Sequence, residues 1–415
     1  SFLQEWFGRL PTSSVYSLTE EVANWMRQQY QVLSNAPALL NDSERYEFLK
    51  AMSKIADAYR KSLYTESFSG RREELKLNEI QSFLLSANEW LANGLEANRR
   101  SDELFQSYNL LKRTGEDRIS IDHLEEMLEG QVAILSSGYL SPEESLRLLN
   151  TLRSSRLYRA DQASYILYPD RTLTAFLDKN RIAESDIQRF KLASRLADHP
   201  ELGIIERDNR GHFHFGPEFR NQNDLTDSLR RLPDEWQPLV ESEGTSLALL
   251  FENTFQHHAF TGRSGTFFAY EGLGSIYWHM VSKLILAVQE TILKADNGDP
   301  ETLQGLKRHY WQVLEGIGIH KSPREYGAFP IDAYSHTPKH AGVQQPGMTG
   351  QVKEDLLIRR NELGLLIEKG QIRFNCILFN SEEFLAEASS FEYIDVHGIP
   401  ATIELPEQSL AFTFC

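Results

Sequence analysis

The residues best suited to chemistry gather between His257 and Glu354, where Gly, His, Tyr, Gln and Thr are denser than an ordinary surface loop requires. The acids of this stretch are Glu271, Glu325, Asp332 and Glu354. Acid–base cleavage of a glycosidic bond uses two carboxyl groups about 5 to 10 Å apart, one of them with a raised pKa. Glu271 precedes an apolar segment whose burial would raise its pKa, so it is the candidate acid, with Asp332 or Glu325 as its partner. A carboxylate there would also stabilise a helix N-terminus, which leaves a structural role open.

The other polar and aromatic residues of this stretch are typical of sugar recognition. Aromatic rings stack on the faces of sugar rings, while amide, imidazole and guanidinium groups bind hydroxyls. The predicted substrate-binding residues are Tyr270, Trp278, His279, Lys283, Arg324, Tyr334, His336, Gln344, Gln345 and Gln351. Aromatic residues belong to hydrophobic cores more often than to binding sites, so a core position is the alternative for each ring.

A helix predicted from Ser275 to about Ala295 must position several of these side chains. It is apolar on nearly every side, so we expect it to be buried all round. Ser275, His279, Ser282 and Lys283 follow the helical repeat and form one narrow polar stripe. Either this stripe faces a wet cavity, or Lys283 reaches solvent at the edge of the helix and His279 makes a hydrogen bond in the core.

The segment Tyr334–Gln351 contains prolines and glycines that exclude a helix, and its polar groups would be unsatisfied in a dry core. It is longer than the usual connection of roughly 4 to 6 residues. We therefore expect it to lie over the polar stripe and to form one wall of the main pocket. The alternative is a surface strap that joins the last strands to the helices.

The composition excludes several classes of partner. A net charge of -16 without a basic patch disfavours nucleic acids and anionic membranes. No apolar run approaches the roughly 20 residues that span a bilayer, and no signal-peptide pattern opens the chain. The two cysteines cannot form a disulfide framework, and the apolar run around Cys376 predicts a buried, inert thiol. We expect a reducing, cytoplasmic location.

No nucleotide-binding loop, zinc-protease motif or hydrolase elbow occurs, so no cofactor is predicted. The adjacent His257 and His258 would point to different faces of a helix or strand, and no metal site is predicted.

Helical periodicity runs almost continuously from Tyr16 to about Leu111 and again from Ile119 to Leu135. Asn41 or Ser43, and later Ser141, are expected helix caps. Leu202–Phe215 alternates around Asp-Asn-Arg-Gly and predicts a β-hairpin, and alternating strands follow near the end of the chain.

These patterns predict a mainly α protein: an (α/α) toroid or toroid-like helical array with a β-hairpin insert and a small C-terminal β-layer. We expect an N-terminal helical region at 1–115, a toroid-like region with the site at 116–360, and a β-layer at 361–415. The chain begins with Ser and stops within an apparent strand, so we expect the β-layer to be truncated and the remainder of a longer chain to exist.

Several short motifs in the last third of the chain occur in a familiar order. A buried helix is followed by the loop PIDAYSHTPKHAG, by GMTGQVKED at the start of a helix, and by IRFNCILF in the closing strands. This order is similar to the last part of the (α/α)6-toroid glycoside phosphorylases of the cellobiose and chitobiose type. The resemblance implies that Thr349, Gly350 and either His336 or His340 bind inorganic phosphate, as suits a helix N-terminus. The large N-terminal β-sandwich of that family is absent, and Pro233–Trp236 is the only counterpart of its acidic motif.

Two hypotheses follow from these residues and this resemblance. The first is a carbohydrate-active enzyme that hydrolyses or phosphorolyses a glycosidic bond in an oligosaccharide, with inorganic phosphate as a potential co-substrate. The second is a non-catalytic portion of a larger carbohydrate-processing protein, which binds glycan or docks another domain. The separation of the carboxyl groups across a cleft would distinguish them.

Overall fold

The computed structural model describes residues 2–124, 126–169, 174–256, 276–296, 298–317, 322, 336–337, 352–368, 370–379 and 381–412. The chain divides into two compact units: Ser1–Asp170 with Leu273–Cys415, and Arg171–Gly272. Helices dominate the described residues, which confirms the mainly α class, and the strands among them pair as two-stranded antiparallel sheets. The described residues show no toroid, so that arrangement stays a prediction.

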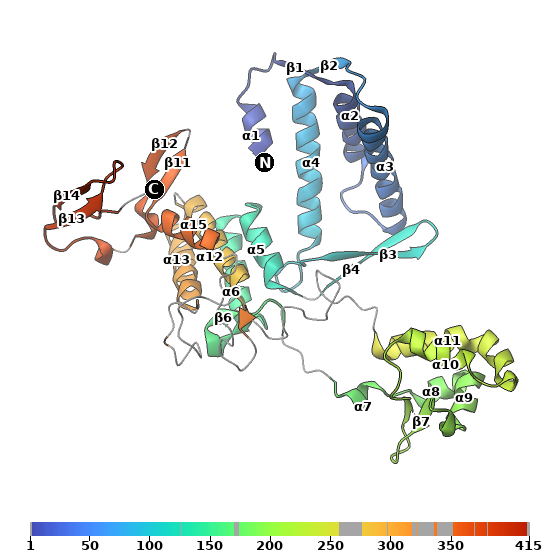
Figure 1. Cartoon of the computed structure of the whole chain (residues 1–415). Helices are drawn as coiled ribbons and strands as arrows, with labels where there is room; N and C mark the ends of the chain where they lie inside the picture. Colours follow the sequence, from blue (N-terminus) through green and yellow to red (C-terminus); the bar gives the residue numbers. More distant parts are fainter. Residues whose placement is uncertain are drawn as a thin grey trace. The chain divides into compact units, whose positions relative to one another are not determined.

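The first unit begins with a helical layer that two short strands interrupt (Figure 1). Its elements are α1 (Phe2–Gly8), β1 (Val15–Thr19), α2 (Glu20–Asn35), α3 (Asp42–Lys61), β2 (Arg72–Lys76) and α4 (Leu77–Ala97). The prediction of near-continuous helix is wrong at β1 and β2, where Val15 pairs with Lys76 and Thr19 with Arg72. β1 is rich in β-branched and aromatic residues, which favour a strand once a partner is available.

The predicted cap of the third helix is confirmed. Asn41 Oδ1 accepts hydrogen bonds of 3.0 Å from the backbone N–H groups of Ser43 and Glu44. The Glu44 side chain in turn accepts one of 2.9 Å from the Asn41 N–H. This reciprocal capping box satisfies donors that the first helical turn leaves open. Across the layer, the rings of Phe48 on α3 and Trp90 on α4 stack at 4.6 Å.

The helix predicted over Ile119–Leu135 is wrong in its first half. Strand β3 (Asn109–Gly115) pairs there with β4 (Arg118–His123), and helix α5 (Leu128–Ser136) begins only afterwards. Ile119 and Ile121 are spaced by two residues, which is the repeat of a strand and not of a helix.

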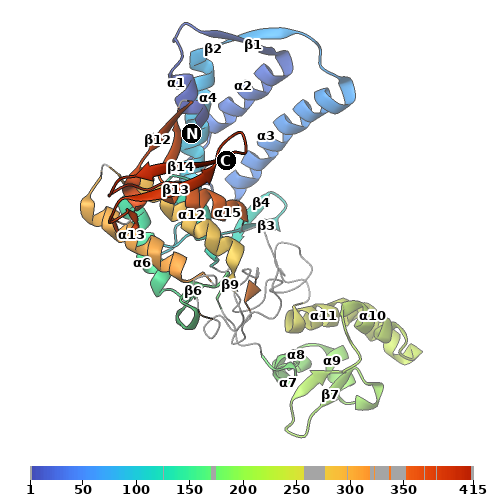
Figure 2. The same cartoon turned by 60° about the vertical axis from the view of Figure 1, so that its left-hand side comes forward.

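The main core of the first unit surrounds α12 (Figure 2). Its remaining elements are α6 (Pro142–Ser154), β5 (Tyr158–Arg159), β6 (Ser164–Tyr165), β9 (Ile276–Tyr277), α12 (Trp278–Lys294), α13 (Pro300–Glu315), β10 (His336–Thr337) and α15 (Val352–Glu362). α12 packs against α5, α6, α13 and α15. Its Val281, Leu284 and Val288 have no exposed surface, so the predicted burial of this helix is confirmed. Ser141 caps α6 with a second capping box, as expected.

The second unit has a hydrophobic core of its own. Its elements are α7 (Phe176–Lys179), α8 (Glu184–Arg189), α9 (Lys191–Ala197), β7 (Ile205–Arg207), β8 (Phe213–Phe215), α10 (Gln222–Arg230) and α11 (Gln237–Phe255). The predicted hairpin is confirmed as β7–β8, with Gly211 at a φ of +89° in its turn. The rings of Phe176 and Phe255 lie 6.2 Å apart, so α7 and the last turn of α11, which bound the described part of this unit, lie in contact.

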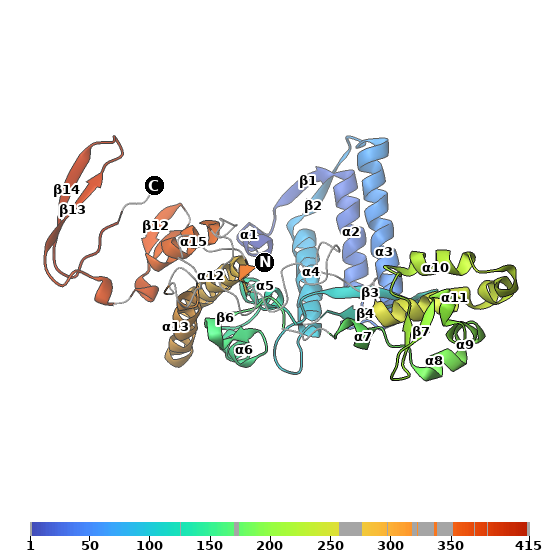
Figure 3. The same cartoon turned by 60° about the horizontal axis from the view of Figure 1, so that its bottom comes forward.

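The predicted C-terminal β-layer consists of two hairpins, which Figure 3 shows as separate ribbons. They are formed by β11 (Leu365–Glu368) with β12 (Gln371–Phe374), and by β13 (Ser389–Ile394) with β14 (Pro400–Leu405). The prediction that Cys376 is buried is wrong, because its thiol is exposed. A single 3-10 turn, Cys376–Leu378, buries Leu378 instead. Among the described residues, no helix combines the length and apolarity needed to cross a membrane.

Candidate functional site

A group of polar side chains lies where β9 runs directly into α12. Tyr277 Oη lies 3.3 Å from His279 Nδ1, and His279 Nε2 lies 3.3 Å from Glu354 Oε1. Three elements thus contribute one residue each to a continuous row: β9, α12 and α15. We call Tyr277, His279 and Glu354 the polar row.

The segment predicted to lie over this end of α12 is described only at its His336–Thr337 backbone. These two residues pair antiparallel with β9, His336 opposite Tyr277 and Thr337 opposite Ile276. The backbone of the segment therefore reaches the polar row at this point. The rest of Tyr334–Gln351 lies outside the described residues, so its role as a pocket wall stays a prediction.

Burial differs along the polar row. The His279 side chain keeps 22% of its surface exposed, whereas that of Glu354 keeps 2%. Lys353 Nζ lies 3.3 Å from Glu354 Oε1, but the buried Glu354 Oε2 has no hydrogen-bond partner among the residues that the structure describes. A buried acceptor without a donor destabilises the folded state by about 1 to 3 kcal/mol. Glu354 therefore needs an explanation other than a contribution to folding stability.

A separate set of hydrogen bonds fixes α15 against α12. The fully buried Gln289 donates to the Ile358 carbonyl at 3.0 Å and to Tyr310 Oη at 3.1 Å. Asn361 Nδ2 donates to Gln289 Oε1 at 3.2 Å. Burial, with the neighbouring Glu362 carboxylate, raises the pKa of the Tyr310 hydroxyl far above its usual value, so Tyr310 stays a neutral donor to Glu362. These buried hydrogen bonds fix the position of α15, and therefore of Glu354, relative to α12.

Two further predicted binding residues lie on α12. Trp278 is completely buried in the hydrophobic core, which favours the core alternative for this ring. Lys283 is half-buried one turn beyond His279, on the same side of the helix. His279, Ser282 and Lys283 thus lie on one side of α12, where His279 and Lys283 are partly exposed and Ser282 is buried.

The remaining predicted site residues cannot be placed. Those outside the described residues are Glu271, Asp332, Glu325, Tyr270, Arg324, Tyr334, Gln344, Gln345, Gln351, Thr349, Gly350 and His340. Of His336 only the backbone is described. In the part of the chain that the structure covers, no three His, Cys, Asp or Glu side chains come together as they would around a metal ion.

Sequence reasoning counted Glu354 among four acids but gave it no role. A signal was present, because Glu354, Ile358 and Asn361 share one face of a helix and are all buried, which predicts a polar contact at each end of that face. What the sequence could not supply was the partner, His279, which is 75 residues away along the chain.

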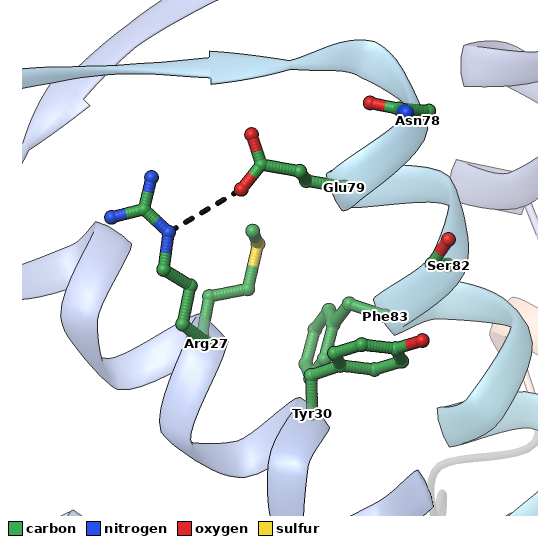
Figure 4. Close-up of a pocket in the computed structure, with 7 residues that line it drawn as sticks. Arg27, Tyr30, Asn78, Glu79, Ser82 and Phe83 are labelled. Atoms are coloured by element: carbon green, nitrogen blue, oxygen red, sulfur yellow. Dashed lines mark hydrogen bonds and ion pairs between the residues drawn. The ribbon is translucent and has the colours of Figure 1, made fainter.

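Figure 4 shows a different cavity, of about 170 Å³, between α2 and α4. Its polar side chains include Arg27 and Glu79, which lie 3.3 Å apart, and Arg27 also binds Glu73. This cavity thus holds its carboxylate paired with a guanidinium. We assign it a structural role.

A larger hollow, of about 720 Å³, lies between the two C-terminal hairpins. It is lined by Leu, Ile and aromatic side chains from β11 to Phe412, among them Phe374, Phe391 and Tyr393. Its lining residues include no carboxylate or histidine, so it is not a candidate for acid–base chemistry.

Comparison with known proteins bears on the second unit. Residues 173–258 match the family described as GH149 phosphorylase insertion domain 2. This range nearly coincides with the unit that the structure separates, Arg171–Gly272. The chain thus contains a domain of the GH149 phosphorylase family, and the resemblance to glycoside phosphorylases is confirmed in this form, although not specifically for the cellobiose and chitobiose type. A search of curated proteins gave no match.

Proposed function

We propose that this chain is a carbohydrate-active glycoside phosphorylase, or a large part of one, and that it cleaves a glycosidic bond of an oligosaccharide with inorganic phosphate. The observation that carries the proposal is the phosphorylase insertion domain at residues 173–258. The polar row adds support, because it places a partly exposed imidazole, with 22% of its side-chain surface accessible, beside the segment whose sequence resembles a phosphorylase site.

Phosphorolysis needs one acid and one bound anion. The acid gives its proton to the leaving oxygen as the glycosidic bond breaks, and a phosphate oxygen forms the new bond to the anomeric carbon. Phosphate thus replaces the water that a second carboxylate activates in hydrolysis. In this proposal Glu271 is the acid, and Asp332 or Glu325 is its partner carboxylate where water takes the place of phosphate. Thr349, Gly350 and His336 or His340 bind the phosphate at a helix N-terminus.

The polar row has a place in this scheme. His279 and Tyr277 stand at the start of α12 and are proposed to contact the bound sugar or phosphate. The remaining predicted aromatic, amide and guanidinium residues would bind sugar hydroxyls. We also propose that the helices of the first unit belong to an (α/α) toroid.

The second candidate function is glycan binding without turnover. It is favoured by one observation: the matched family is an insertion domain, which need not carry the reacting groups. Under this hypothesis the chain binds oligosaccharide or docks another domain of a larger carbohydrate-processing protein.

One experiment separates the two. The protein is incubated with inorganic phosphate and a panel of disaccharides and longer oligosaccharides, and sugar 1-phosphate is followed by ³¹P NMR. Binding of the same panel is measured by calorimetry. Formation of a sugar 1-phosphate supports phosphorolysis, binding without product supports the second function, and release of free sugar independent of phosphate would show hydrolysis instead. Neither product nor binding across the panel would sink both proposals.

A further inference from the structure

We infer that Glu354 is a positioning residue, which fixes the ring orientation and the proton of His279 at the candidate site. This inference rests on the proposed function only for its kinetic consequences. Its structural part concerns the protein without ligand.

Hydrogen-bonding chemistry defines the arrangement of the polar row. A carboxylate only accepts hydrogen bonds, so the contact of 3.3 Å between Glu354 Oε1 and His279 Nε2 requires the proton on Nε2. In a neutral ring Nδ1 is then the acceptor, and the Tyr277 hydroxyl at 3.3 Å donates to it. Glu354 therefore selects one of the two tautomers of His279, and His279 in turn orients the hydroxyl of Tyr277.

Glu354 is not needed to hold α15 in place. The bonds from Gln289 to the Ile358 carbonyl and from Asn361 to Gln289 anchor this helix one to two turns further along. An apolar side chain at 354 would avoid the cost of a buried carboxylate with an unpartnered oxygen. Because Glu354 destabilises the fold and is not required for helix packing, its effect on His279 is the best explanation for its presence.

The geometry also limits what else faces His279. Tyr277 meets its ring edge-on, with the two ring centroids 5.7 Å apart, and Glu354 occupies the opposite nitrogen. Lys353, whose side chain is 73% exposed, approaches Glu354 Oε1 and not the imidazole. Lys283 lies one turn beyond His279 on α12. Among the described residues, Glu354 is thus the only carboxylate that contacts the ring.

The test compares Glu354→Gln with Glu362→Gln. Both change a carboxylate of α15 to an amide of the same shape, but Glu362 binds Tyr310 and Arg359 and not His279. The tautomer of His279 is read from the ¹⁵N shifts of its ring in the ligand-free protein, assigned by their loss in His279→Gln. We expect the Nε2-protonated form in wild type and in Glu362→Gln, and a mixed or reversed tautomer in Glu354→Gln.

Kinetics provide the second measurement. Glu354→Gln should lower kcat for phosphorolysis by about 10- to 100-fold and change KM little, because positioning acts in the transition state. The same change made in the His279→Gln background should have almost no further effect. If Glu354→Gln leaves the ¹⁵N shifts of His279 unchanged, or lowers kcat equally in both backgrounds, the inference is overturned.

Two controls keep the outcomes distinct. If wild type forms no sugar 1-phosphate, the proposed function fails while the NMR comparison still decides the role of Glu354. If Glu354→Gln does not fold, Glu354→Met provides an apolar replacement of similar length. A Met variant that is stable and retains the wild-type tautomer of His279 also counts against the inference.

Discussion

Asn361 on α15 and Gln289 on α12 join their side chains inside the core, the Asn361 amide donating to Gln289 Oε1 at 3.2 Å. Because His279 and Glu354 meet near the start of both helices and Gln289 and Asn361 meet further along, α12 and α15 run in the same direction. The buried amide pair therefore sets the register that brings Glu354 opposite His279.

Replacement of Gln289 by Leu should destabilise the first unit. Leu at this position can neither accept from the Asn361 amide nor donate to the Ile358 carbonyl, so the Asn361 amide would lose its acceptor in the core and the Ile358 carbonyl one hydrogen bond. We expect a loss of about 2 to 4 kcal/mol in the free energy of unfolding, measured by urea titration. Gln304→Leu, at an exposed position of α13, should change it by less than about 0.5 kcal/mol. Equal effects of the two variants would contradict the assigned role.

Replacement of His279 by Ala should abolish most of the proposed activity without unfolding the protein. His279 lies in the first turn of α12 and keeps 22% of its side-chain surface exposed, so the space left by its removal is open to water. We expect kcat/KM for phosphorolysis to fall on the order of 100-fold, as for the loss of one group that acts in the transition state. His397→Ala, in the exposed turn between β13 and β14, is the matched control and should retain full activity. Activity retained in His279→Ala would exclude the polar row from the site.

His309 should make the protein less stable in mild acid. Burial, assisted by the charges of Arg153 and Arg308, lowers the pKa of His309 to about 4. The unfolded chain takes up this proton near pH 6.5 and the folded protein does not, so stability is full above pH 6.5 and is lost as the pH falls to about 4. The free energy of unfolding should fall by up to about 3 kcal/mol over this pH range.

Urea titrations between pH 7 and pH 4 measure this loss. His309→Gln keeps a side chain that can bind Asn150, the present partner of His309 Nε2 at 2.9 Å, and should flatten the pH dependence. His397→Gln, at an exposed position, should leave it as in wild type. A His309→Gln variant with an unchanged slope would show that other groups cause it.

Asp208 should hold the hairpin of the second unit closed. Although desolvation acts to raise the pKa of Asp208, hydrogen bonds from His212, His214 and Arg210 outweigh it and lower this pKa well below its usual range. The stabilisation is therefore present above the ordinary Asp pKa and is lost as the pH falls below it. In Asp208→Ala we expect faster hydrogen exchange of the amides in β7 and β8. Glu206→Ala, at an exposed position of the same hairpin, should exchange as wild type does. If the amides of both variants exchange at the same rate, Asp208 does not stabilise the hairpin and its turn depends on Gly211 alone.

The second unit should fold without the first. It has its own hydrophobic core, and its first and last helices are in contact through Phe176 and Phe255. A fragment of residues 171–272 is expected to show helical circular dichroism and one cooperative thermal transition. Phe255→Ala should lower the midpoint of that transition, while Leu249→Ala, at an exposed position of α11, should not. A fragment that melts without cooperativity would show that its core depends on the rest of the chain.

Local features could be predicted from the sequence, whereas pairings between distant segments could not. The helix caps at Asn41 or Ser43 and at Ser141 depend on neighbouring residues only and are predicted from the sequence, and the structure selects Asn41 and adds the reciprocal glutamate of each capping box. The strand β1 was missed because its partner, β2, follows more than 50 residues later. The hairpin β3–β4 was missed for another reason: its isoleucines also fit a helical pattern when the two-residue repeat is overlooked.

The candidate site shows the same division. The buried helix and its polar stripe follow from periodicity, because a side-chain repeat is visible in one segment. The contact between His279 and Glu354 joins two segments that are distant in the sequence. They are brought together only by the packing of α15 on α12. For Trp278 the residue type left sugar stacking and a core position open, and its complete burial favours the core position.

The contact between Phe176 and Phe255 bears on how such a chain could have been assembled in evolution. A segment whose first and last helices lie side by side can be inserted at a single surface loop of another domain. Gain or loss of the whole unit would then be a single genetic event with little effect on host folding. Related chains that lack residues 173–258 but keep α12 and α15 are therefore expected to exist.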